Sequence, residues 1–377
     1  MAARSFCTMV TSAEALARSL AGARAEVSGA TGGLVFVAGA LTHDLPGVAG
    51  LVRSAWRGVP TCIVPAAGVI TERGEVEGAP AAAGLLWSGG KVVPFALPEA
   101  SPPGALRDTL GNIVGQRAAT VLLFARSDFS AADLEGISSA APQACVLGAG
   151  AVGGAPLLLD ASGEALRGRN AGLALLGSAP PLVESSPACR LLTPLGRIAE
   201  TSGSVVLTLG DTPALDVLSS CVPELRGAGA GAGAPQPVVF AALAPTEGDD
   251  RFLIRPVRGI DPTRKGVLIG PEARVGMRMA FAVRDAASAR SSLEAATRHL
   301  AQQALGAAPR FALYLSCAGR GQSLHGSPDV EARILRQRFG DLPIAGMHSA
   351  FEIAPWAPGE AKIALYTGVL ALFRSPS

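Results

Sequence analysis

The fold is decided by one stretch of sequence, Phe311–Ile353, which reads FALYLSCAGRGQSLHGSPDVEARILRQRFGDLPIAGMHSAFEI. Its first residues, Phe311–Ser316, form a short apolar run before a turn, which predicts a buried strand. The next five, Cys317–Gly321, combine two glycines with one arginine, a pattern typical of a turn that carries a fixed positive charge. The remainder predicts a loop, a helix and a second strand.

Strong local signals predict a helix after this turn. Ser327 is a favoured N-cap residue, Pro328 is a favoured first helical residue, and acidic side chains follow in the first turn. Val330 and Ile334 lie four positions apart and begin one apolar face. Gly340 can end the helix, because glycine adopts the left-handed conformation without strain.

A second strand, Pro343–Met347, then leads to His348 and Glu352. The stretch thus places a cysteine, an arginine, two histidines and a glutamate at strand ends or in the loop before the helix. Small-ligand sites of α/β proteins form at the carboxyl ends of strands. We therefore expect a small-ligand site at this edge of the predicted sheet.

The same supersecondary unit occurs three times. The first copy runs from Leu34 to Ile70, the second starts at Thr120 and returns through Pro142, and the third is the stretch quoted above. In each copy a strand, a loop and a helix precede a strand that enters a turn rich in glycine and alanine. Gly89 and Gly90, between two further strand-like runs, predict a hairpin turn. The fold class expected is α/β (mixed α+β), with mixed sheets built from repeated strand–loop–helix–strand units.

The chain is expected to form two related domains. The first covers residues 1–180 and the second covers residues 241–377. Residues 181–240 connect them and include a low-complexity Gly/Ala-rich loop, Gly227–Pro237. A long helix, Ser288–Leu305, precedes the third repeat.

Two segments, CAGRGQSLHG at 317–326 and PIAGMHSAFEIAP at 343–355, resemble the signature segments of the FIST family (F-box and intracellular signal transduction proteins). The family pattern has a strand, Cys-x-Gly-Arg-Gly, a helix, and a strand that enters a Gly-x-x-x-x-Gly-Glu-Ile-like turn. Phe351 occupies the position where the family usually has the second glycine, which puts a left-handed turn there in question. The resemblance implies a FIST N-like sensory domain at 1–180 and a FIST C-like domain at 241–377.

The resemblance further implies a small-molecule-binding sensory protein of bacterial signal transduction. Its ligand would be an amino acid or another carboxylate, and it would act through a separate signalling protein such as a histidine kinase. Arg320 would bind the ligand carboxylate as a planar fork, helped by the amides of the flanking glycines, while His348 or Glu352 would contact an amino group. The expected ligand-binding residues are Cys317, Gly319, Arg320, Gly321, His325, His348, Glu352 and His43. No catalytic residue and no metal ligand is predicted.

Composition excludes several other classes. The net charge of +2 argues against a nucleic-acid-binding protein with a large basic surface. The longest uncharged stretches are broken by glycine and proline, so no membrane helix is expected. The six cysteines show no metal-type spacing and no secretion signal precedes them, which favours reduced thiols and a cytoplasmic location. The sequence has no G-x-G-x-x-G in the arginine turn and no P-loop, so nucleotide binding is not expected.

Three alternatives to this hypothesis remain open. A haem-based gas sensor would use His348, His325 or His43 as its axial ligand, although no cofactor is predicted otherwise. A thiol-dependent enzyme would use Cys317, whose pKa would fall if its thiolate faced the loop amides and Arg320. A scaffold with no ligand would lack a convergent polar pocket.

Overall fold

The computed structural model describes residues 2–102, 104–221, 238–245 and 251–374. The predicted Gly/Ala-rich loop, Gly227–Pro237, lies outside these residues. The chain forms two compact units, one made of residues 1–186 and 290–377 and the other of residues 187–289. This grouping differs from the sequential division expected, because strands from the beginning and the end of the chain pair within the first unit. Among the described residues, no helix has the length and apolarity needed to span a lipid bilayer.

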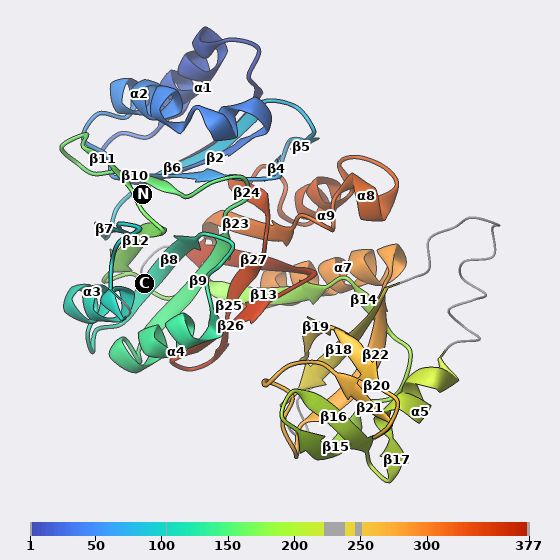
Figure 1. Cartoon of the computed structure of the whole chain (residues 1–377). Coiled ribbons are helices and arrows are strands. Elements are labelled where there is room, and N and C mark those ends of the chain that lie inside the picture. The colour runs from blue at the N-terminus through green and yellow to red at the C-terminus, as the bar shows by residue number, and fades with distance from the viewer. Residues whose placement is uncertain (1, 103, 222–237, 246–250, 375–377) are drawn as a thin grey trace. The chain divides into compact units, whose positions relative to one another are not determined.

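The first unit contains three six-stranded sheets (Figure 1). In spatial order, the first sheet consists of β1 (Ala3–Met9), β6 (Ala81–Ser88), β2 (Ala30–Ala38), β3 (Thr61–Pro65), β10 (Leu157–Leu159) and β11 (Ala165–Arg167). The second consists of β7 (Lys91–Leu97), β12 (Asn170–Leu176), β8 (Ala119–Ala125), β9 (Ala144–Gly150), β25 (Glu352–Ala357) and β26 (Glu360–Ala364). The third consists of β13 (Leu182–Pro187), β27 (Thr367–Arg374), β23 (Pro309–Cys317), β24 (Ile344–Ser349), β4 (Gly68–Thr71) and β5 (Gly74–Glu77).

The three sheets share one topology. Each is built around a parallel pair, β2–β3, β8–β9 or β23–β24, and on one side an antiparallel strand, β6, β12 or β27, joins this pair. On the other side each sheet receives a hairpin from another repeat: β10–β11 pairs with β3, β25–β26 with β9, and β4–β5 with β24. The exchange closes a cycle, since every repeat gives one hairpin and receives one. The mixed sheets and repeated units expected from the sequence are thus confirmed.

Alternating strand residues divide the apolar side chains between two layers. Leu34 and Phe36 of β2 lie in a central core with Leu122 and Phe124 of β8 and with Leu313 of β23. The intervening residues of each parallel pair face outward into a separate cluster beside helices. Each sheet is therefore buried on both faces.

Helices cover the outer face of each sheet. The outer cluster of the first sheet includes α1 (Ala13–Glu26) and α2 (Leu45–Ala55), and that of the second includes α3 (Ala105–Ile113) and α4 (Ala131–Ala140). The outer cluster of the third sheet includes α7 (Ala286–Gln303) and α9 (Val330–Phe339). Short helices η1 (Gly39–His43) and α8 (Gln322–His325) follow β2 and β23.

The second unit contains one nine-stranded sheet. Its members are β14 (Cys189–Leu191), β15 (Gly196–Ser202), β16 (Val205–Leu209), β17 (Thr212–Pro213), β18 (Val239–Ala244), β19 (Leu253–Pro256), β20 (Gly259–Asp261), β21 (Gly266–Leu268) and β22 (Arg278–Arg284). The pairs β15–β16, β18–β22 and β20–β21 are antiparallel, and α5 (Ala214–Ser220) contributes to the core of this unit.

Two local predictions are wrong in detail. Gly89 and Gly90 both have positive φ, but the strands that flank them enter different sheets, so they join two layers instead of forming a hairpin. The third-repeat helix begins at Val330, two residues after Pro328, because Asp329 adopts a left-handed conformation at the N-cap. Its predicted end is confirmed, since Gly340 follows the last helical residue with positive φ.

Candidate functional site

The outer face of the third sheet carries polar side chains at the carboxyl ends of its parallel strands. Ser316 of β23 and His348 of β24 are paired neighbours, and neither side chain is exposed to solvent. Alternation puts both on the helix side, since Leu315 and Met347 lie in the central core. A buried polar pair here is unexpected for a purely structural strand and indicates a site.

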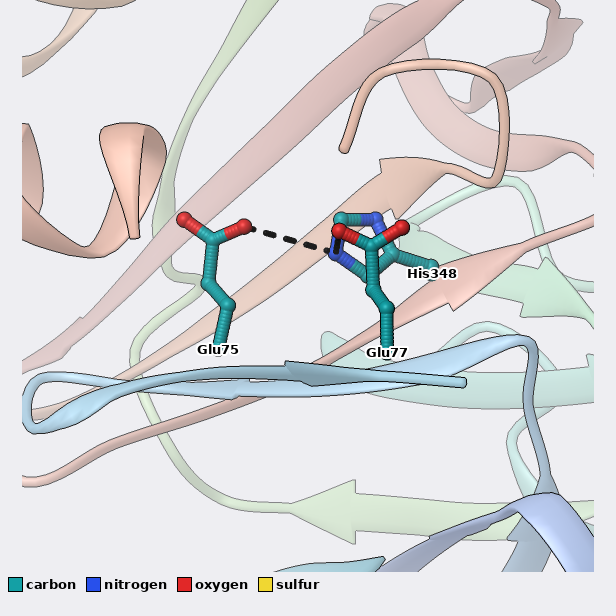
Figure 2. A group of neighbouring side chains, drawn as sticks. All are labelled: Glu75, Glu77 and His348. Atoms are coloured by element: carbon teal, nitrogen blue, oxygen red, sulfur yellow. Dashed lines mark ion pairs between the residues drawn. The ribbon is translucent and has the colours of Figure 1, made fainter. Parts of the chain in front are cut away.

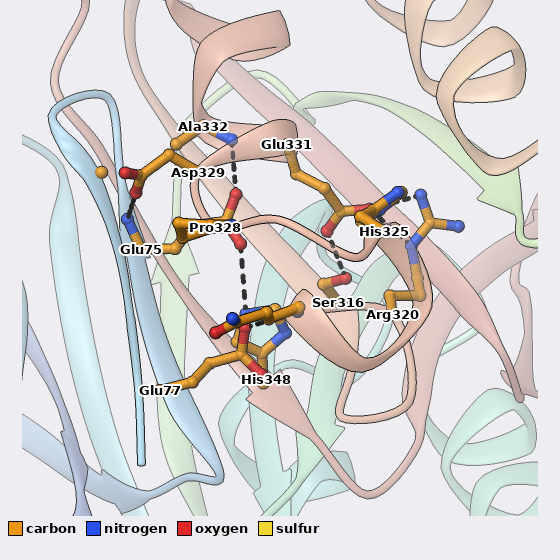
Figure 3. Close-up of polar contacts among 12 residues, drawn as sticks. Glu75, Glu77, Ser316, Arg320, His325, Pro328, Asp329, Glu331, Ala332 and His348 are labelled. Carbon is orange, nitrogen blue, oxygen red and sulfur yellow. Dashed lines mark hydrogen bonds and ion pairs between the residues drawn. The ribbon is translucent and has the colours of Figure 1, made fainter. Parts of the chain in front are cut away.

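Arg320 and Glu331 form a fully buried ion pair in front of this edge (Figure 3). The Arg320 Nε donates to Glu331 Oε1 at 2.7 Å, and its terminal nitrogens donate to the carbonyl and hydroxyl of Ser186. The second oxygen of Glu331 accepts a hydrogen bond from Ser316 at 2.7 Å. The guanidinium that was predicted to bind a ligand carboxylate is therefore engaged by a carboxylate of the protein.

The pair shifts both pKa values in the direction that keeps the two groups charged. Burial alone would raise the pKa of Glu331, but the facing guanidinium outweighs it and holds this pKa well below its usual range. Burial would likewise lower the pKa of Arg320, and the carboxylate of Glu331 reverses that effect. Both side chains remain ionised at neutral pH.

His325 lies on the same ion pair. Its Nε2 is 3.4 Å from Glu331 Oε1, and its side chain is 1% exposed. The other ring nitrogen, Nδ1, has no hydrogen-bond partner in the described part of the chain. The predicted loop histidine thus lies inside the site.

The exchanged hairpin brings two glutamates to His348 (Figure 2). The Nε2 atom of His348 is 3.5 Å from Glu75 Oε2 and 3.9 Å from Glu77 Oε1. Sequence reasoning missed both glutamates. The signal was the alternation Gly74-Glu-Val-Glu, which puts two carboxylates on one face of a strand.

Backbone amides hold the two carboxylates in place. Glu75 Oε1 accepts a hydrogen bond from the amide of Ala332 in the first turn of α9, and Glu77 Oε1 accepts one from the amide of Gln322. Each carboxylate keeps a second oxygen for another partner. We name the whole group the polar cluster; it consists of Glu75, Glu77, Ser316, Arg320, His325, Glu331 and His348.

His348 is fully buried, yet neither ring nitrogen has a hydrogen-bond partner within the described ranges. Burial alone would lower its pKa, but the facing carboxylates, with Glu75 first among them, outweigh burial and raise the pKa above its usual value. A buried polar group without a hydrogen bond destabilises the folded state. His348 is therefore placed for something other than stability.

Two glycines make room for the cluster. A Cβ on Gly68, the β4 partner of His348, would lie 2.8 Å from the imidazole ring. A Cβ on Gly321 would lie 2.2 Å from the Glu77 carboxylate. Gly321, predicted to offer its amide to a ligand, thus has a clear role in leaving space for an acidic side chain.

Cys317 and Glu352 lie apart from this cluster. Cys317 follows Ser316 in β23, so alternation turns its side chain to the other face of the sheet. Burial, together with the nearby carboxyl of Glu352, raises the pKa of the Cys317 thiol to about 11. The Gly319 amide and Arg320 lower this pKa as expected, but burial outweighs them, which does not favour a thiolate at neutral pH.

Glu352 is fully buried and binds Ser349. The Ser349 hydroxyl lies 2.7 Å from Glu352 Oε1 and 3.1 Å from the carbonyl oxygen of Ser316. A hydroxyl has one proton to donate, so both contacts are satisfied when a protonated Glu352 donates to Ser349. Burial, the largest effect, raises the pKa of Glu352 well above its usual value, in agreement with this arrangement.

Replacing Glu352 by glutamine is expected to change how stability depends on pH. Because the folded pKa is raised, the contribution of Glu352 to stability is complete below about pH 4.5 and is lost as pH rises through the folded pKa. Each pH unit between the unfolded and folded pKa values costs about 1.4 kcal/mol. Glu352→Gln should remove this loss, so the free energy of unfolding of the variant should increase relative to that of the wild type as pH rises. Urea unfolding at pH 5 and pH 8 measures it, and identical pH dependence in both proteins would refute the neutral carboxyl.

The remaining predicted residues divide between the site and the fold. Gly319 lies in the turn before α8 and interacts with Cys317. His43 lies at the end of η1 after β2 of the first sheet, whereas the polar cluster lies on the third sheet. Phe351 is a core residue that stacks on Phe129, and it does not have positive φ. A Cβ on Gly150 would lie 2.5 Å from the Phe351 ring. The absence of a side chain at Gly150 therefore makes room for the phenylalanine at position 351.

A pocket of about 370 Å³ opens beside the cluster. It lies between the turn that joins β4 to β5 and the start of α9, and it shares Asp329 and Ala332 with the contacts that hold Glu75. Its lining includes three arginines, Arg73, Arg333 and Arg336. Four pockets of about 230 to 550 Å³ in the described residues, this one included, are lined without any histidine.

Comparison with known proteins identifies the family. A family model described as FIST C domain matches residues 214–355. An uncharacterized protein of Mycobacterium tuberculosis, MT0656, is 31% identical over 379 residues, which cover 95% of this chain and 96% of that protein. An uncharacterized protein of Mycobacterium bovis, Mb0898c, is 37% identical over 134 residues, covering 34% of this chain and 33% of that protein. The chain belongs to the FIST family of signal-transduction sensory domain proteins.

Proposed function

We propose that the protein is a sensor that binds a small carboxylate-containing molecule, with amino acids among the candidates, and acts through a separate signalling protein such as a histidine kinase. The cytoplasm is the proposed location, which agrees with the six cysteines forming no disulfide in the part of the chain that the structure describes. The family supports the sensory role. The pocket of about 370 Å³ supports the class of ligand.

The observation that carries the proposal is the set of arginines around this pocket. Arg336 and Arg333 project from α9 and are exposed, and Arg73 approaches from the hairpin turn. Arginine forks bind carboxylates through paired, charge-assisted hydrogen bonds. Arg333 is partly occupied by backbone carbonyls and Arg73 lies 3.3 Å from Glu72, which makes Arg336 the leading ligand-binding side chain.

Occupancy of the pocket can reach the polar cluster through two shared residues. Asp329 Oδ1 accepts a hydrogen bond from the amide of Glu75, and the amide of Ala332 donates to the Glu75 side chain. A ligand that moves the first turn of α9 would therefore move Glu75 and, with it, the contacts of His348. In this proposal Arg320 does not contact the ligand but holds Glu331 in position, since its donors already bind Glu331 and Ser186.

Arg336→Ala is expected to weaken ligand binding by about 10-fold or more, since a charged hydrogen bond contributes about 1.5–3 kcal/mol. The ligand is first found by thermal shift with the twenty amino acids and simple dicarboxylates, and its affinity is then measured by calorimetry. Arg338→Ala is the matched control, because Arg338 lies on the same helix but does not line the pocket. Equal affinity in both variants would reject the pocket as the ligand site.

The haem alternative stays a prediction. Two of its candidate axial ligands, His348 and His325, have side chains that are at most 1% exposed, and the third, His43, follows β2 of the first sheet. An absorption spectrum of the protein expressed with haem supplied tests it directly.

A further inference from the structure

The polar cluster contains more negative than positive charge. It holds three carboxylates, Glu75, Glu77 and Glu331, and one guanidinium, Arg320. These four groups alone carry a net charge of −2, in a region where the side chain of Glu75 is 3% and that of Glu331 0% exposed. Buried charge without a counter-charge is costly, so groups of this kind are paired or bind metal ions.

The excess charge gathers around one point. One ligand atom from each of Glu75, Glu77 and His348 lies within 4.8 Å of the other two. Figure 2 shows the two carboxylates rising from the same face of β5 toward the imidazole ring. Since metal–ligand bonds to nitrogen and oxygen are about 2.0–2.2 Å long, two ligands of one ion lie at most about 4.4 Å apart. The distances from His348 Nε2 to Glu75 and Glu77, 3.5 and 3.9 Å, fall within this limit.

His348 is the independent sign that the point has an occupant. Its ring is fully buried and aimed at the two carboxylates, and Nε2 has no hydrogen-bond partner among the residues that the structure describes. Glu75 at 3.5 Å and Glu77 at 3.9 Å are within ion-pair distance of Nε2, but both are longer than an ordinary hydrogen bond, so the nitrogen lacks a direct partner.

The surroundings hold the three side chains in position. The Ala332 and Gln322 amides each fix one carboxylate oxygen, as outer-shell donors do around metal ligands. Gly68 and Gly321 leave the volume that the imidazole and the Glu77 carboxylate occupy. The arrangement therefore holds its ligands in place without a metal.

We propose that Glu75, Glu77 and His348 bind one divalent transition-metal cation. Two carboxylates and one imidazole suit Mn²⁺, Fe²⁺ or Zn²⁺ better than Ca²⁺, which prefers oxygen ligands throughout. Three protein ligands leave coordination positions free, and Glu77, whose side chain is 26% exposed, marks the accessible side. The inference deepens the proposed sensory function and rests on it, because Ala332, which lines the arginine pocket, also holds the Glu75 carboxylate through its amide.

The test uses the full chain, stripped with a chelator and dialysed, with Mn²⁺ or Zn²⁺ alone as the probe. Calorimetry and elemental analysis after equilibrium dialysis are expected to show one bound equivalent per chain. Glu77→Gln should weaken binding at least about 10-fold, the lower end of the effect of disturbing a metal site. Because Glu77 is partly exposed, this variant is expected to fold even if a replacement of buried His348 does not.

His299→Gln is the matched control. His299 lies on α7, is 57% exposed, and has one carboxylate, Glu184, at 2.6 Å, so it offers a histidine–glutamate pair without the third ligand. Metal binding should be unchanged in this variant. Absence of bound metal in the wild type, or equal binding in Glu77→Gln and wild type, would overturn the proposal.

The experiment separates this inference from the proposed function. Ligand binding that depends on Arg336 and persists in excess chelator, without bound metal, would refute the metal site and support the sensory function. The opposite result is stoichiometric metal binding that Glu77→Gln abolishes, with no ligand whose affinity changes in Arg336→Ala. It would support the metal site and refute the arginine pocket as the ligand site.

Discussion

Replacing Glu331 by alanine is expected to lower the free energy of unfolding by about 3–5 kcal/mol, the cost of removing one partner of a buried ion pair. The change leaves the guanidinium of Arg320 buried at 0% exposure, with Ser186 as its remaining hydrogen-bond partner among the described residues. It also removes the acceptor of Ser316 and the oxygen that His325 faces. Urea-induced unfolding followed by circular dichroism measures the loss.

Glu135→Ala serves as the control for this prediction. Glu135 is an exposed glutamate in the middle of α4, and a surface substitution of this kind usually changes stability by less than about 0.5 kcal/mol. Replacing Arg320 and Glu331 together by methionine and leucine should cost less than the sum of the single changes, because neither charge is left alone. A loss below about 1 kcal/mol in Glu331→Ala would show that the pair is solvated in solution.

Gly346→Ala is expected to destabilise the fold by about 3 kcal/mol, the upper end of the usual range for overpacking a core. A Cβ at this position would lie 1.9 Å from the carbonyl oxygen of Tyr314 in the adjacent parallel strand. Backbone cannot move aside as a flexible side chain can, so β23 and β24 would have to separate beside His348. Thermal and urea unfolding provide the measurement.

The second repeat carries the same constraint, since a Cβ on Gly148 would lie 1.7 Å from the carbonyl oxygen of Leu123. Gly22→Ala is the matched control, because Gly22 lies inside α1 and a Cβ added there would have no atom of the described residues within 4 Å beyond its own helix backbone. Alanine there should stabilise the helix by about 0.5–1 kcal/mol. Similar stability in Gly346→Ala and wild type would mean that the two strands are less closely packed than the structure shows.

Local physics explains what the sequence determined by itself. The apolar run at Phe311–Ser316 became a buried strand, and Gly340 ended the following helix. The three strand–loop–helix–strand repeats were recognisable for the same reason, since hydrophobic period and turn residues act over a few positions. The sheet edge that carries His348 was also located, because this histidine follows from the end of a predicted strand.

Tertiary structure alone decided which repeat each hairpin joins. Gly89 and Gly90 have the positive φ of a hairpin turn, yet the strands on either side pair with β1 and β2 in one sheet and β12 in another. Strand pairing is set by side-chain burial on both faces, which depends on partners far along the chain. A turn motif reflects only neighbouring residues, so it could not predict which strands pair.

The same reason explains the site. Arg320 and Glu331 are eleven positions apart, and their pairing, with Ser186 as a third partner, became visible only once the loop was folded. Glu75 binds the amide of Ala332, which is 257 positions away, and the exchanged hairpin carries it to His348. The sequence by itself determined the strands, the helices and one edge of the site, since those depend on neighbouring residues. Only the tertiary structure decided the acidic half, because the pairing of β4 with β24 and hydrogen bonds to the amides of Ala332 and Gln322 place carboxylates of the first repeat beside the histidine of the third.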